Sequence, residues 1–425
     1  MASAVRAQVD TGVPEVSLRE VLQRARIDAP AVAAAAAAYG LREAERDAAL
    51  GAYYPVLTMQ GTSGYAHDNR LVLPGAPRID SKSLTAEASV SLEWAAIDPA
   101  RGDRADSSAA LARAQHLATE AVRRNAVLLA AELYVQATAA ALLTVDAQLS
   151  LERRTSQALA IADLVQAGTR SPVDMERAKI EALSARYALE GRRNDELAAY
   201  AALAAALGRP ATHPVRPRAD GLQALEVDAA TARALALPGA GRPELRSQQQ
   251  LIAARREEYS AALGARLPTL GVSASASISY LDVLGGEGID GHQYGGAALL
   301  YLRWSGLDPA VWTRANVAGA AVARAESDLA ATQHAIASEA VAATHAVLRA
   351  KTERERANAV LQAAELAREA QNGRYRAGVA SMLELLDAEN LEQDARRQRI
   401  EAERDYHVAT ARLLFASGRL DALAR

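Results

Sequence analysis

The sequence predicts a mainly α-helical protein that also carries four β-strands of a membrane β-barrel. Half of the 425 residues are hydrophobic but only 4% are aromatic, and the apolar content rests mainly on alanine and leucine, which favour helices. Two long segments, 99–167 and 309–377, contain no proline after their first residue. Elsewhere apolar and polar residues alternate over about ten residues, which is typical of a strand between lipid and water.

The charge balance and the cysteine count exclude several classes of function. The 48 Lys and Arg residues are matched by 51 Asp and Glu residues, so no basic excess attracts a nucleic acid. The absence of cysteine excludes disulfides, thiolate metal sites and cysteine nucleophiles. No stretch approaches the ~20 apolar residues of a membrane-spanning helix.

Landmarks recur along the chain in one order, which predicts a tandem duplication. Three pairs lie 210 residues apart and two lie 213 apart: Trp94 and Trp304, Gly168 and Gly378, Gly208 and Gly418, then Pro30 and Pro243, Pro55 and Pro268. We therefore divide the chain into an N-terminal extension (1–15), a first repeat (16–207), an inter-repeat linker (208–242), a second repeat (243–420) and a C-terminal tail (421–425).

Each repeat is expected to contain a helix, two strands, a very long helix and a return helix. The first helices are 16–50, with Ser17 as N-cap, and 243–264. Asp-Pro pairs begin the long helices 99–167 and 309–377, and glycine ends them. The return helices are 171–207 and 381–417. Since a helix rises ~1.5 Å per residue, each long helix is a rod of roughly 100 Å that needs partners in a bundle or coiled coil.

The predicted strands are 56–65, 84–94, 270–280 and 294–304. In 84–94 every second residue is apolar, from Leu84 to Trp94. Aromatic residues at the strand ends fit the two interfaces of a membrane: Tyr54, Tyr65, Trp94, Tyr280, Tyr294 and Trp304. A half-buried sheet of a soluble domain would show the same alternation. In a membrane, four strands cannot close a barrel, so this interpretation requires an oligomer.

These features resemble the TolC-type outer-membrane efflux proteins, over residues 16–420. The resemblance rests on the duplication, the Tyr54-Pro55 entry into a strand, the Trp-x-x-x-Asp exits and the Gly-x-x-Ser turns. It implies a homotrimer whose twelve strands form one outer-membrane barrel, continued by an α-helical barrel across the periplasm. It also implies a periplasmic adaptor (membrane fusion) protein and an inner-membrane pump as partners, and export in drug efflux or type I secretion. The location implied is the bacterial outer membrane, reached with a signal peptide that this chain lacks and that we take to have been removed.

The resemblance also implies which residues matter. The turns Gly168-Thr169-Arg170-Ser171 and Gly378-Val379-Ala380-Ser381 would form the adaptor-docking tip. The periplasmic constriction and its locking network would be Glu384, Asp387, Tyr375 and Asp174. The family's arginine is replaced by Ala380, so the lock lacks its cation unless Arg376 or Arg170 substitutes.

Helix capping offers another interpretation of two of these acids. Ser381 to Glu384 reads as a capping box, and Ser171 to Asp174 as a near version of one. Acidic residues in a first turn are also favoured by the helix dipole. Asp387 lies one turn further on, where capping does not explain it, and is the better pore candidate.

No catalytic, cofactor or metal site is expected. The seven histidines show no ligand spacing, and Gly285 to Gly288 lacks the lysine of a phosphate loop and reads as a turn between strands. The chain is therefore not expected to be an enzyme. The competing function is that of a soluble, alanine-rich coiled-coil scaffold or periplasmic tether.

Overall fold

The structure, a computed structural model, describes residues 13–70, 79–218, 222, 225–227, 229–235, 242–284 and 290–420. The chain forms two compact units. Unit 1 comprises Met1–Ala38, Leu117–Arg246 and Ala330–Arg425, and unit 2 comprises Tyr39–His116 and Ser247–Leu329. Most of the N-terminal extension, parts of the linker, the turn expected at 285–288 and the tail 421–425 lie outside the described residues.

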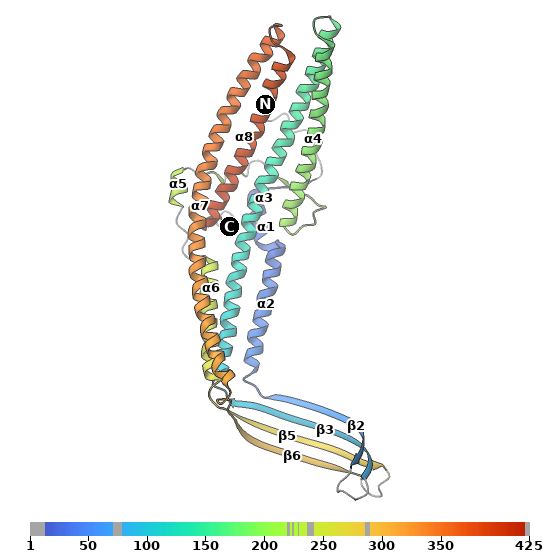
Figure 1. Ribbon diagram of the computed structural model, residues 1–425, viewed down its shortest axis with the longest axis vertical. Helices are drawn as coiled ribbons and strands as arrows, with labels where there is room; N and C mark the ends of the chain where they lie inside the picture. The colour runs from blue at the N-terminus through green and yellow to red at the C-terminus, as the bar shows by residue number, and fades with distance from the viewer. Residues whose placement is uncertain are drawn as a thin grey trace. The chain divides into compact units, whose positions relative to one another are not determined.

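Unit 1 is built around four long helices that lie side by side in the order α4, α3, α8, α7 (Figure 1). Their bounds are Arg101–Gln166 (α3), Pro172–Ala206 (α4), Pro309–Arg376 (α7) and Met382–Ala416 (α8). Polar contacts support this order. The Thr144 hydroxyl of α3 donates to the Arg192 carbonyl of α4 (3.1 Å), and Arg412 of α8 pairs with Glu132 of α3 (2.7 Å). The long helices have 66 and 68 residues, and both return helices have 35.

The first predicted helix, 16–50, is wrong as one element. The structure has α1 (Leu18–Asp28) and α2 (Pro30–Gly51), separated by Ala29 in an extended conformation (φ −60°, ψ 135°). A proline disfavours the helical conformation of the residue before it, while its own ring suits the first position of a helix. Pro30 therefore ends one helix and begins the next.

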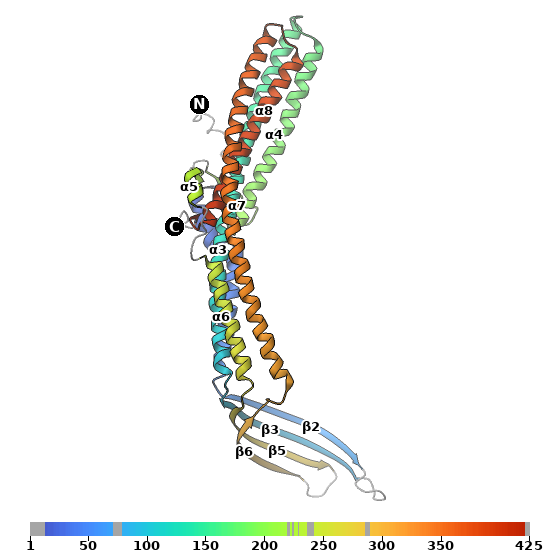
Figure 2. The same cartoon turned by 60° about the vertical axis from the view of Figure 1, so that its left-hand side comes forward.

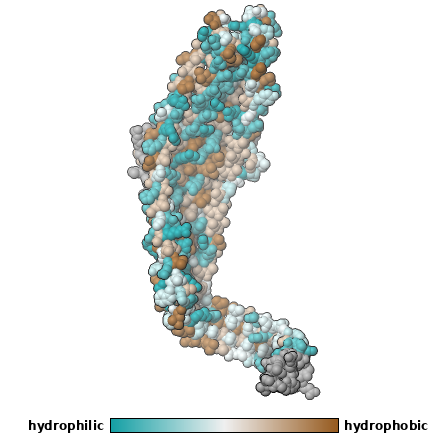
Figure 3. All heavy atoms as spheres, in the orientation of Figure 1, coloured by the Kyte–Doolittle hydropathy of each residue, from teal (hydrophilic) through white to brown (hydrophobic). Residues whose placement is uncertain are grey.

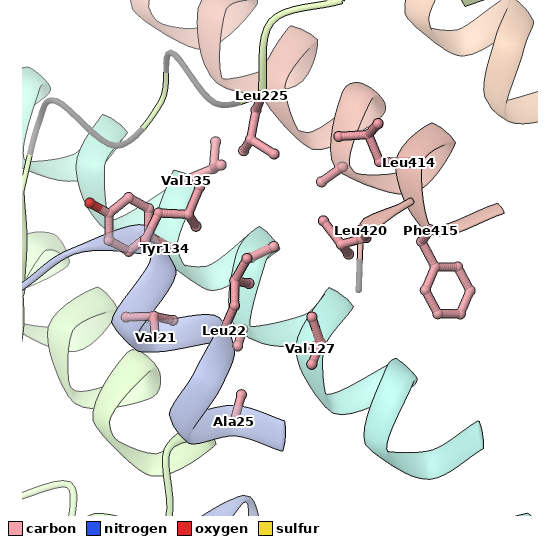
Figure 4. Packing of buried hydrophobic residues seen from close by; sticks show 14 of the residues in the cluster. Val21, Leu22, Ala25, Val127, Tyr134, Val135, Leu225, Leu414, Phe415 and Leu420 are labelled. Carbon is pink, nitrogen blue, oxygen red and sulfur yellow. The ribbon is translucent and has the colours of Figure 1, made fainter. Parts of the chain in front are cut away.

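A hydrophobic core joins α1 to the middle of the long helices (Figure 4). Val21 and Leu22 of α1 pack against Val127 and Tyr134 of α3, and α8 adds Leu414. The linker contributes as well, through a fully buried Leu225. The linker is also less irregular than expected, because it contains β4 (Arg216–Pro217), which pairs in parallel with β1 (Glu15–Val16), and the short helix α5 (Ala229–Ala234).

The core also explains an apolar stretch that the sequence analysis overlooked. One 18-residue window of α3 has a mean hydropathy of 1.7 and is long enough to cross a membrane by length and composition alone. Several residues of α3, including Val127, Ala130 and Tyr134, are buried in the core of unit 1. Packing within the protein covers 44% of that window.

Unit 2 contains a four-stranded antiparallel sheet together with α6 (Pro243–Gly264) and parts of α2, α3 and α7 (Figures 1 and 2). The strands run in the order β2, β3, β5, β6. Their bounds are Val56–Arg70, Ile79–Ile97, Thr269–Leu284 and Asp290–Arg303. They are longer than predicted, and Trp304 lies just past the end of β6. The pairing of β3 with β5 joins the two repeats, and β2 and β6 are left as open edges.

Equivalent residues cap the helices of both repeats. Four glycines have left-handed backbones, with φ between 73° and 77°: Gly168, Gly208, Gly378 and Gly418. At the start of the long helices, the carboxylates of Asp98 and Asp308 accept the backbone N–H groups of Ala100 (3.0 Å) and Ala310 (2.9 Å). Each satisfies a donor that the first turn of a helix leaves free.

Candidate functional site: the helix tips and the strand face

The two tip turns have the same backbone construction. In the first, the N–H of Thr169 donates to the carbonyl of Leu164 (3.0 Å), and in the second Val379 donates to Arg374 (3.0 Å). These bonds, with a left-handed glycine before them, form the glycine cap that ends a helix. Ser171 and Ser381 then cap the return helices, so each long helix reverses its direction within a few residues.

A small hydrophobic cluster, which we call the tip core, holds the four helix ends of unit 1 together. It consists of Ile161, Ala178, Tyr375, Ala380, Met382, Leu385 and Leu386. The members come from α3, α4, α7, the second turn and α8. The turns are therefore fixed against one another by apolar burial.

Tyr375 and Arg170 connect the second tip turn to the first. The ring of Tyr375 is buried in the tip core, and the guanidinium of Arg170 lies over it, 4.2 Å from the centroid. Arg170 also donates a hydrogen bond to the Tyr375 carbonyl. Ala380 is buried beside them, whereas Arg376 is exposed. Arg170 is therefore the cation that contacts Tyr375 among the described residues.

The environment keeps the Tyr375 phenol protonated. Burial raises its pKa, and the nearby Asp174 adds to the rise, while the Arg170 cation opposes it. The hydroxyl is buried and has no hydrogen-bond partner among the described residues.

The acidic residues of the second return helix differ in what they contact. Glu384 accepts the backbone N–H of Ser381 (2.8 Å), and the Ser381 hydroxyl accepts the N–H of Glu384 (3.3 Å). This is a complete capping box. Asp387 is exposed one turn further along α8, on the same side as Glu384 because residues three apart are neighbours on a helix. In the first return helix, Ser171 accepts the N–H of Val173 (3.2 Å) and Asp174 is partly buried.

Exposed apolar side chains surround the tip turns. Val379 is 70% exposed, Val173 57% and Leu383 55%. Figure 3 shows hydrophobic residues among hydrophilic ones over this end of the helices.

One face of the sheet in unit 2 is apolar across all four strands. The pairing places Leu57, Leu92, Ala274 and Ala298 in one row, and Met59, Val90, Ala276 and Gly296 in the next. The opposite face is rich in serine and threonine: its rows contain Thr58, Ser91, Ser275, Ala297, Gln60, Ser89, Ser277 and Gly295. One side therefore suits lipid and the other water.

The predicted interface aromatics fall at two levels of the sheet. Near the helices lie Tyr54, Trp94 and Trp304, and the other level contains Tyr65, Tyr280 and Tyr294. The two tryptophans also have partners within the protein, since their indole N–H groups donate to the carbonyls of Tyr53 and Arg266 (both 3.0 Å). Each tryptophan therefore ties the end of its hairpin's second strand, β3 or β6, to the segment before the first strand, β2 or β5.

Two other aromatic residues, Tyr53 and Trp312, have cations over their rings that were not expected from the sequence. Arg101 lies over the ring of Tyr53, 5.1 Å from the centroid, and Arg266 lies over Trp312 at 4.4 Å. On the polar face, Glu93 accepts from Tyr301 (3.2 Å) and Arg303 (3.3 Å). The sequence held one signal for the first two contacts: Tyr53 and Arg266 occupy matching positions in the two repeats.

Comparison with known proteins identifies the second repeat and the fold. Residues 238–419 match the family model of the outer membrane efflux protein. A search among curated proteins gave no match. The fold is similar to that of a membrane protein from Pseudomonas aeruginosa, with a TM-score of 0.74 and 18% identity over 94% of this chain and 92% of the other.

Two further solved structures agree. The outer membrane protein VceC of Vibrio cholerae has a TM-score of 0.66 and 17% identity, over 94% of this chain and 96% of its own. The CmeC outer membrane channel of Campylobacter jejuni has a TM-score of 0.67 and 15% identity, over 95% of this chain and 85% of its own. Residues 238–419 thus match the outer membrane efflux protein family, and the chain as a whole has the fold of these outer-membrane channels.

Proposed function

We propose that the protein is a homotrimeric channel-tunnel of the outer membrane, which exports small molecules or proteins received from a periplasm-spanning efflux or type I secretion machinery. One observation carries the proposal: a four-stranded sheet with one continuous apolar face and two open edges, β2 and β6. It acts by passage through a lumen, so no residue is assigned a catalytic, cofactor or metal role.

The open edges are the argument for a trimer. Unpaired backbone groups are not tolerated in lipid, and a barrel needs about eight strands or more to close. If β6 of one copy pairs with β2 of the next, three copies give twelve strands. The edge helix α4 supports this, because Ile180 (60% exposed) and Tyr187 (75% exposed) lie seven residues apart on its surface.

The tips are the proposed contact with a periplasmic adaptor and, through it, an inner-membrane pump. Both turns end long helices, and Thr169 and Val379 are exposed there. Among the tip residues, we assign Tyr375, Arg170 and Asp174 to the network that holds the two turns together. Asp387, with Glu384, is assigned to the narrowest point of the tunnel.

Assembly tests this function directly. The purified protein should be a trimer in detergent and should fractionate with the outer membrane, because its apolar sheet face and open edges require lipid and other copies. Mass measurement in detergent, together with membrane fractionation, decides the point. A monodisperse, water-soluble monomer would contradict the proposal and favour a coiled-coil scaffold or periplasmic tether.

Selectivity tests the acidic constriction. Three copies of Asp387 and Glu384 around one axis would favour cations and bind multivalent ones. The Asp387→Ala, Glu384→Ala double variant should therefore lose cation selectivity and block by trivalent cations in planar bilayers.

The capping box leads to a separate prediction for Glu384. Glu384→Ala alone should cost roughly 1 kcal/mol of stability, because it removes half of the box. Single-channel recordings and melting temperatures of both variants separate the two roles. If the double variant keeps its selectivity and is merely less stable, Glu384 is a cap and the acidic ring does not exist.

A further inference from the structure

A buried carboxylate joins three helices of unit 1 beyond the tip core. Glu392 of α8 is only 2% exposed. One of its oxygens lies 2.8 Å from Nε of Arg396 on the same helix and 3.3 Å from Nη1 of Arg153 on α3. The other lies 2.8 Å from Nε of Arg368 on α7. We call Glu392 and these three arginines the ionic node.

Further contacts of two arginines, Arg154 and Arg396, extend the node to the neighbouring residues. Arg154 donates to Asn390 (2.7 Å) and Gln393 (3.0 Å) of α8 and also pairs with Glu181 of α4. Arg396 reaches Glu365 of α7 at 2.7 Å. All four long helices of unit 1 are therefore linked at one level.

A buried ion pair adds little net stability, but it specifies an arrangement, because removing one partner leaves the other charge uncompensated. In this node one carboxylate faces three guanidinium groups. Without it, the three guanidinium groups, which are 30–43% exposed, would lose the one carboxylate that they share. The apolar packing beside the node is thin, consisting of Leu361, Ala364 and Ala395. The charges therefore determine how α8 sits against α3 and α7 here.

A second acceptor lies one turn nearer the tip. Glu389 is partly buried, and its Oε2 atom has no hydrogen-bond partner among the described residues. Burial raises the pKa of its carboxyl group, while Arg154, Gln157, Arg368 and Arg153 oppose the rise. Arg153 and Arg368, which face Glu392, thus have an alternative partner three residues away on the same helix. Exchange of ion-pair partners between two discrete positions is a common basis of helix shifts.

We propose that Glu392 is the positioning residue of the tunnel tip: the ionic node holds the tip end of α8 against α3 and α7, and its release lets the second tip turn move outward and widen the opening. Glu392 lies five residues beyond Asp387 on the same helix, roughly 8 Å along its axis, so a shift at the node moves the constriction. This inference rests on the proposed function as a channel.

Single-channel conductance of reconstituted trimers tests the proposal. Glu392→Gln removes the charge and keeps the size, and it should raise the conductance roughly twofold or more, because small changes at such nodes are amplified into discrete rearrangements. Asp394→Asn is the matched control on the same helix. Its carboxylate is exposed and, among the described residues, pairs locally with Arg397 (3.1 Å), so its loss should leave the conductance unchanged.

A crosslinking experiment measures the opening itself. The chain has no cysteine, so Val379→Cys places a single thiol on the exposed second tip turn. A short bifunctional thiol reagent should link copies within the trimer, and Glu392→Gln should lower the yield. If Glu392→Gln prevents trimer formation, Arg153→Gln and Arg368→Gln each remove one arm of the node and should show the same changes in weaker form.

Two outcomes overturn the proposal. One is a Glu392→Gln trimer with wild-type conductance and crosslinking but a lower melting temperature, which would make the node a purely structural contact. The other is wild-type behaviour of both arginine variants. A wild-type protein that forms trimers in the membrane but no channel contradicts the proposed function itself.

Discussion

Val90→Arg is expected to keep the protein out of the outer membrane, whereas Ser91→Arg, the next residue of the same strand, should be tolerated. Val90 lies on the apolar face between Met59 and Ala276, and Ser91 lies on the polar face between Thr58 and Ser275. An arginine on the lipid face of a membrane strand costs about 2–4 kcal/mol near the bilayer centre, while a substitution facing the lumen mainly alters selectivity.

The two variants control for each other, because they introduce the same side chain into the same strand. The amount of trimer in the outer-membrane fraction measures the effect. A threefold assembly repeats the cost in every copy, so the loss for Val90→Arg should be nearly complete. Equal insertion of both variants would show that the apolar face does not meet lipid.

Gly378→Trp is expected to abolish export without reducing the trimer. A Cβ atom added to Gly378 would meet nothing within 4 Å, so a large side chain would project from the tip into the space proposed for the adaptor. The backbone there has φ +77°, which any other residue adopts at some cost.

The matched control is Gly378→Asn, because asparagine is one of the few residues that tolerate a left-handed backbone. It should retain most export, and Gly168→Trp should repeat the defect in the first turn. Export from cells and the level of trimer are measured together. Normal export by both tryptophan variants would place docking elsewhere on the protein.

Local signals in the sequence were enough to predict most of the elements. A proline or glycine acts on its own backbone, so Gly168, Gly378 and Pro309 mark helix ends wherever the chain folds. Alternation likewise assigns residues such as Val90 and Ser91 to opposite faces before any partner strand is known. The break at Ala29 also had a local signal, Pro30, which the sequence analysis used as a landmark of the repeat instead of a helix boundary.

The candidate site could be predicted less well from the sequence, because its contacts join residues that are far apart along the chain. Arg170 and Tyr375 come from different repeats and meet only when the two tip turns pack. Glu392 looks like any charged residue of a long helix until Arg153 and Arg368 are brought around it. Burial of a charge depends on the whole bundle, so no window of sequence reveals it.

The pairing of β3 with β5 has a consequence for how the chain folds. The hairpins β2–β3 and β5–β6 join residues that are near in sequence, but the partners across β3 and β5, such as Ile97 and Leu270, are separated by α3, α4, the linker and α6. Contacts of such high sequence separation form slowly, since the intervening chain must be ordered first. We therefore expect the helices of unit 1 to fold early and the sheet to complete last. Until the sheet is complete, each protomer has two separate hairpins whose unpaired edges are exposed to water. The longer this state lasts, the more a protomer is prone to aggregate with other chains through these edges.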